Sequence, residues 1–246
     1  MKHTVFKILN STLVILALLV GTAGMAACSN SPAINQQQVQ ANLSTVDEIY
    51  PAQNLNSIEK SDNVNGVRFT MSLEEYTEKF NKIKRSLGED DLIPKDGWKQ
   101  KSDVKADENH VSLCYYYYNG DTYNLTATVE LESKKLVNVG LGTTISNFMS
   151  DEGNAEASNK TLENAAIMAE AVCQFPTGSE SFLENVFYRV TTDSGDSVWY
   201  QGFVFSLSTQ ENKTDSKSSV MLYRVFPVSD ELKEEWELVE YENFQN

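Results

Sequence analysis

Residues 111–131, VSLCYYYYNGDTYNLTATVEL, decide the fold of this chain because they hold two strand patterns with a turn signal between them. Aromatic and apolar residues alternate before and after the dipeptide Asn119-Gly120, as is typical of paired strands. This dipeptide favours a two-residue hairpin turn of type I′, which needs positive φ angles at both positions. We therefore predict an antiparallel hairpin in which Tyr118 pairs with Asp121.

The turn also determines which residues share a face of the hairpin. The pairs predicted on the buried face are Tyr116–Tyr123 and Cys114–Leu125. The other face carries tyrosine and threonine, which suit a half-exposed surface or a second packed layer formed by residues 155–246. A protein-binding surface is often rich in tyrosine, which has a large ring and a polar tip. The candidate binding residues on this face are Tyr115, Tyr117, Thr122, Asn124 and Thr126.

Helices and further strands are expected on both sides of the hairpin. Ser72 and Glu75 form a capping box at the start of a predicted helix over 73–87, in which apolar residues recur at helical spacing. A third strand at 137–143 completes an antiparallel meander. The other predicted elements are helices at 161–173 and from Ser181, strands at 198–207 and 220–228, and a short helix at 230–237. The fold class is therefore α+β, with antiparallel meander sheets packed by helices. The order of elements is compatible with two similar helix-on-sheet halves.

The composition describes an acidic chain with enough apolar residues for a packed core. Of its 246 residues, 41% are hydrophobic and 10% aromatic, and the formal charge is −15. Such a charge repels nucleic acid and anionic lipid head groups, so we expect no nucleic-acid partner. No D-x-D-x-D-G loop of the calcium-binding type occurs. We expect no metal site and no cofactor.

Residues 18–28, LLVGTAGMAAC, follow two lysines and an apolar run, and the chain turns polar after them. This order is that of a signal peptide. With Cys28 after small residues, the segment resembles the lipobox of bacterial lipoproteins, although Met25 stands where leucine is commoner. The resemblance covers residues 1–28 only. It implies that Cys28 takes a diacylglyceryl group and becomes the acylated first residue after cleavage.

Three other interpretations of this segment compete with lipidation. A buried core helix is disfavoured because nothing amphipathic precedes the segment and its flank carries lysines. An uncleaved membrane-spanning helix needs about 20 apolar residues, whereas the run here is shorter and is interrupted at Gly21 and Gly24. An ordinary secretion signal would leave Cys28 unmodified. Each buried methylene of an acyl chain contributes about 0.8 kcal/mol, so two or three chains hold a protein on a bilayer. The expected location is therefore extracytoplasmic, on a bacterial membrane, with the lipid bilayer as a partner.

The predicted organisation has three parts. Residues 1–27 form the signal peptide, and residues 28–64 are polar and read as a flexible tether, with a short helix near 39–49 as the alternative. Residues 65–246 form a single α+β domain, with a candidate subdivision near 146–159.

Cys114 and Cys173 are the cysteines beyond the signal peptide. An exported protein can carry a disulfide, and this one would close a loop of about 60 residues and stabilise the fold by roughly 4 kcal/mol. The alternative is a pair of buried thiols that act as small hydrophobic groups.

No catalytic constellation is recognisable in the sequence. His110 is the only histidine beyond the signal peptide, and neither a G-x-S-x-G nor a C-x-x-C motif occurs. We therefore expect no catalytic residues and no enzyme activity. The favoured function is binding of an envelope protein or a glycan. The alternatives are a solute-binding lipoprotein of an uptake system and an exported hydrolase that uses paired carboxylates.

Overall fold

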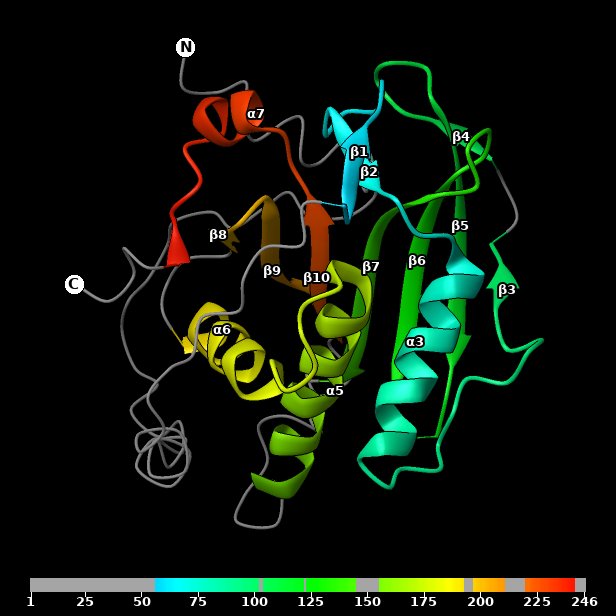
Figure 1. Cartoon of the computed structure of the whole chain (residues 1–246), viewed down its shortest axis with the longest axis vertical. Coiled ribbons are helices and arrows are strands. Elements are labelled where there is room, and N and C mark those ends of the chain that lie inside the picture. Colours follow the sequence, from blue (N-terminus) through cyan, green and yellow to red (C-terminus); the bar gives the residue numbers. More distant parts are fainter. Residues whose placement is uncertain are drawn as a thin grey trace, which may run out of the picture.

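A computed structural model describes residues 56–101, 104–121, 123–144, 155–192, 197–210 and 220–241. In these residues, three helices cover one face of an antiparallel sheet (Figure 1). This arrangement confirms the predicted α+β class.

The main sheet has eight strands in the described residues, in the order β3-β5-β6-β7-β10-β9-β8, with β4 also paired to β5. Every pair in it is antiparallel. The strands are β3 (Lys99–Gln100), β4 (Lys105–Ala106), β5 (Ser112–Asn119), β6 (Asn124–Glu130), β7 (Leu136–Thr144), β8 (Ser197–Tyr200), β9 (Phe203–Gln210) and β10 (Val220–Pro227).

Two meanders of three strands, β5-β6-β7 and β8-β9-β10, build this sheet, and each follows one or two helices in the chain. They join where β7 pairs with β10, so the strand order reads symmetrically about that pair. The two expected helix-on-sheet halves therefore share one continuous sheet. Strands from either side of the subdivision considered near 146–159 are hydrogen-bonded together as β7 and β10. Residues 145–154 lie outside the described residues.

Helix α3 (Leu73–Ser86) confirms the predicted first helix and its capping box. The Ser72 hydroxyl accepts from the Glu75 N–H, and the Glu75 carboxylate accepts from the Ser72 N–H at 2.7 Å. Its apolar stripe places Tyr76 and Phe80 fully in the core, but Leu87, which we assigned to the same stripe, is 46% exposed. The helix ends before Leu87, which therefore points away from the sheet.

Helices α5 (Ala155–Cys173) and α6 (Glu180–Thr192) lie against the middle and the other side of the same sheet face (Figure 1). Both begin earlier than predicted, α5 at Ala155 and α6 at Glu180, so Ser181 lies inside the first turn of α6 and does not begin it. The short helix α7 (Asp230–Glu235) confirms the predicted C-terminal helix and is capped by Ser229.

The β5-β6 hairpin forms as predicted, but its register differs. Tyr118 pairs with Leu125, and the Gly120 N–H donates to the Tyr123 carbonyl at 2.9 Å across a four-residue loop. The loop is wider because Tyr123 turns into the core, where its ring lies 5.5 Å from that of Phe80. The shift of four residues is even, so every side chain keeps its predicted face.

A second hairpin was missed by the sequence pattern. The predicted strand at 198–207 is divided into β8 and β9 by a turn at Gln201 and Gly202, where φ is 48° and 89°. Both positive φ values match a type I′ turn. Apolar residues continue on both sides of these two positions, which hides the turn in a hydropathy pattern.

The predicted boundary between the tether and the folded domain, at residue 64, lies too far along the sequence. Strand β1 (Ile58–Lys60) lies within 28–64, yet it pairs with β2 (Val67–Phe69). The Thr70 N–H donates to the Ser57 carbonyl at 3.0 Å, and Ser57 is fully buried. The folded domain therefore includes residues from Asn56 onward.

Cys28 and the signal segment lie outside the described residues. No helix in the described part of the chain is long and apolar enough to cross a bilayer. Cys114 and Cys173 are buried and have free thiols, without the disulfide that we considered. Cys173 belongs to the main core cluster and Cys114 does not, so they are held in different surroundings.

Candidate functional site

We call the side of the main sheet opposite α3, α5 and α6 the outer face. Alternation along β5 places Tyr116 and Tyr118 against the helix-covered core, whereas Tyr115 and Tyr117 are half-buried and belong to neither hydrophobic cluster. Of the candidate binding residues, Tyr115, Tyr117, Asn124 and Thr126 lie together on the outer face. Thr122 lies outside the described residues. Helices α5 and α6 of the second half pack on the opposite face and do not cover Tyr115 and Tyr117.

One row of residues crosses the outer face from β5 to β8, and we call it the Arg224 row. Each member is the cross-strand partner of the next, so neighbouring side chains are separated by about one strand spacing of 4.8 Å. Its members are Tyr117, Thr126, Gly140, Arg224, Ser206 and Ser197. The row combines an aromatic ring, three hydroxyl groups of small residues and one guanidinium group.

Gly140 lets the row pack closely at its centre. A Cβ atom there would lie 2.7 Å from Thr126 Oγ1 and 3.0 Å from the Tyr223 carbonyl oxygen. Any side chain at this position would therefore displace Thr126 or the β10 backbone. Glycine lets the Thr126 and Leu222 side chains approach each other directly beside Arg224.

Arg224 is half-buried on the outer face of β10, and burial lowers the pKa of its guanidinium group. Its neighbours in the register are all uncharged. They are Leu222 and Phe226 along β10, Asn138, Gly140 and Gly142 on β7, and Val204, Ser206 and Ser208 on β9. Among the described residues Arg224 makes no hydrogen bond and no ion pair. A half-buried cation without a counter-charge is unfavourable for folding.

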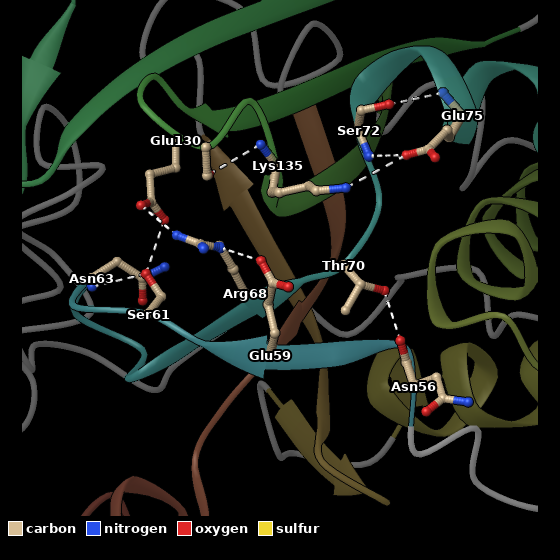
Figure 2. Close-up of polar contacts among 11 residues, drawn as sticks. Asn56, Glu59, Ser61, Asn63, Arg68, Thr70, Ser72, Glu75, Glu130 and Lys135 are labelled. Atoms are coloured by element: carbon tan, nitrogen blue, oxygen red, sulfur yellow. Dashed lines mark hydrogen bonds and ion pairs between the residues drawn. The ribbon is translucent and has the colours of Figure 1, made fainter.

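Arg68 shows how the same side chain is accommodated elsewhere in this chain (Figure 2). Its guanidinium group lies 2.7 Å from the Glu59 carboxylate and 2.6 Å from that of Glu130. Ser61 donates to the other Glu130 oxygen at 2.9 Å. This network fastens the β1-β2 hairpin to the end of β6 and leaves Arg68 fully engaged, in contrast to Arg224.

Carboxyl groups gather where α5 meets α6. Burial and the nearby Glu180 raise the pKa of Glu170 to about 7, while the backbone N–H groups of Ser179 and Gly178 oppose this shift. Burial, followed by Glu163 and Glu180, raises the pKa of Glu184 to about 7. Glu170 therefore lies beside the backbone N–H groups of Gly178 and Ser179, which immediately precede α6.

No cluster of His, Cys, Asp and Glu residues suited to a metal ion occurs in the described part of the chain. His110 is exposed in a turn with φ of 66°, and its N–H donates to the Asp107 carbonyl at 3.0 Å. The Asp107 carboxylate accepts from the Asn109 and Val111 N–H groups. Asp107 thus organises the turn that holds His110.

Sequence reasoning missed Arg224, Ser206 and Gly140 as parts of this surface. A glycine inside the third strand was the available signal for the close contact at Gly140. The signal for Arg224 was a charged residue at the centre of the apolar strand VMLYRVFP. Its importance emerges only when the facing strands are known.

A comparison of the chain with family models, with curated proteins and with solved structures finds no match.

Proposed function

We propose that this chain is a lipid-anchored extracytoplasmic protein that binds an envelope protein or a glycan without catalysing a reaction. The outer face supports the binding part of the proposal. It brings half-buried tyrosines, short polar side chains and an arginine that has no counter-charge among the described residues onto one face of the sheet. Arginine and tyrosine are the residues that most often dominate binding surfaces.

The anchoring part of the proposal depends on the sequence from 18 to 28. The lipobox resemblance implies that Cys28 carries the acyl chains, and the polar residues after it separate the folded domain from the bilayer. The formal charge of −15 disfavours electrostatic attachment to an anionic membrane, so acylation is the means of attachment in this proposal.

A solute-binding lipoprotein is a weaker proposal for this chain. Such proteins bind their ligand between doubly wound lobes with parallel strands, whereas the described strands here form antiparallel sheets. An exported hydrolase with paired carboxylates is also weaker, because Glu170 is directed at the start of α6.

The attachment is tested by growing a bacterial host that expresses the full chain with radiolabelled palmitate. We expect label in the wild type and none in Cys28→Ala. Cys114→Ala removes a buried thiol from the folded domain and serves as the matched control, which should keep the label. Label in Cys28→Ala, or its absence from the wild type, would contradict the anchor.

A further inference from the structure

We propose that the Arg224 row binds a carboxylate-bearing glycan, with the carboxylate on Arg224 and the neighbouring sugar units on Thr126 and Tyr117. This inference rests on the proposed binding function and deepens it by naming the class of ligand. Its first support is the charge of Arg224, which has no counter-charge in the described part of the chain. Its second support is the polar and aromatic surface that extends from Arg224 across β7, β6 and β5.

The positive charge of Arg224 favours a ligand that carries an anionic group. A guanidinium group offers a planar fork of donors that fits both oxygens of a carboxylate. All register neighbours of Arg224 on β7, β9 and β10 are uncharged, so an incoming carboxylate meets no competing acid from these strands. Folding has already removed part of the water around the half-buried guanidinium group. An ionic contact made in this less hydrated environment is stronger than one made in bulk water.

The rest of the row selects a sugar over a peptide. Tyr117 lies three strands from Arg224, a span of about 14 Å, with Thr126 and Gly140 between them. The Thr126 hydroxyl can donate and accept, and the Tyr117 ring, its partner across the strands, offers an apolar surface with a polar tip. A peptide would instead use a free strand edge, and β7 and β10 are paired on both sides.

The charge of the whole chain limits how acidic the glycan is. With a formal charge of −15, the protein repels a dense polyanion. A ligand with isolated carboxylates among neutral sugars suits both the single arginine and the acidic surroundings. A disaccharide with one uronic acid is therefore the smallest suitable probe.

The test compares cellobiouronic acid, which has one carboxylate, with cellobiose, its neutral counterpart. Binding to the full chain is measured by saturation-transfer NMR and by calorimetry in a detergent without sugar groups. We expect the acidic disaccharide to bind at least tenfold more tightly than cellobiose, as for a hydrogen bond to a charged group. Arg224→Gln should lose this preference.

Arg85→Gln is the matched control, because it removes the same charge from an exposed position on α3 and should bind like the wild type. Arg224→Lys keeps the charge without the planar fork and should bind several-fold more weakly than the wild type. This second variant decides the question if Arg224→Gln does not fold. Unchanged binding by Arg224→Lys in that case overturns the proposal.

Three further results would overturn the assignment. They are no binding of cellobiouronic acid by the wild type, equal binding by Arg224→Gln and the wild type, and tighter binding of a capped Ser-Glu-Ser peptide than of the disaccharide. The last result would make the row a peptide site. In each case palmitate labelling at Cys28 reports separately on the anchored protein, so failure of the glycan assignment is distinguishable from failure of the anchor.

Discussion

Single residues on the outer face show how closely the sheet is packed there. Gly140 and Gly142 lie two positions apart on β7 and face the same side, but their surroundings differ. A Cβ at Gly142 would meet its nearest atoms at 3.9 Å, which is ordinary contact, whereas at Gly140 the Thr126 hydroxyl oxygen lies at 2.7 Å. The same substitution should therefore have different effects at the two positions.

We expect Gly140→Ala to lower the free energy of unfolding by about 1–3 kcal/mol, as overpacking does in a well-packed region. Gly142→Ala is the control and should be neutral or slightly stabilising, because alanine restricts the unfolded chain more than glycine does. Urea unfolding followed by circular dichroism measures both. Equal stability of the two variants would contradict the close packing at Gly140.

At the residue scale, the sequence predicted which face of a strand a side chain occupies better than it predicted the side chain's neighbours on other strands. Tyr115 and Tyr117 were assigned to the outer face from strand alternation alone, and they lie there. The position of Arg224 beside Gly140 and Ser206 could not be predicted, because it depends on which strands pair across the sheet. Cross-strand neighbours are far apart in sequence, and no local signal specifies them.

At the scale of secondary-structure elements, the contact between α5 and α6 contains groups that titrate near neutral pH. The pKa values of Glu170 and Glu184 are both raised to about 7, chiefly by burial. The folded state therefore keeps protons that the unfolded state releases above its ordinary carboxyl pKa of about 4.3. This difference destabilises the folded state as the pH rises from about 4.5 to 7.

We expect Glu170→Gln to stabilise the protein at pH 8 by about 1–3 kcal/mol, since the amide needs no proton to stay neutral. At pH 4.5 the variant and the wild type should differ little. Unfolding in urea between pH 4.5 and 8 measures the slope, which should be shallower in the variant. Glu78→Gln, at an exposed position of α3, changes the same charge and should leave the slope unaltered. A wild-type stability that rises between pH 5 and 8 would contradict this account.

Helix α3 and the β8-β9 hairpin mark the limits of prediction for elements. The capping box at Ser72 and Glu75 is a local signal, so the start of α3 was correctly predicted. The turn at Gln201-Gly202 lies inside an apolar run. The hydropathy pattern alone therefore predicted one long strand across these residues. A turn within a buried segment is specified by backbone conformation, which composition reports poorly.

At the scale of the whole molecule, β7 and β10 join the two meanders into one sheet, and α3 contacts α5 across them. The chain should therefore unfold as one cooperative unit in spite of its two halves. Tryptophans report on both halves. Trp98 donates to Thr77 on α3, whereas Trp199 and Trp236 belong to the small cluster beside α7.

We test this with two variants. Within each variant, we expect the urea midpoint measured by fluorescence to equal the midpoint measured by circular dichroism. Trp98→Phe retains the reporters of the second half, and the double substitution Trp199→Phe with Trp236→Phe retains the reporter of the first. Each variant serves as its own reference, because the comparison is between two signals of one sample. Separate transitions within a variant would indicate two independent halves.

The sequence by itself determined the class of fold, the faces of the central hairpin and the capped first helix, because these follow from local periodicity and short-range hydrogen bonds. It also carries the lipobox resemblance on which the proposed anchor depends. Only the tertiary structure decided that the two meanders share one sheet, that β1 belongs to the domain, and that Arg224 faces uncharged neighbours. The physical reason is that strand pairing joins segments distant in the chain, and its register depends on how side chains such as Tyr123 pack in the core.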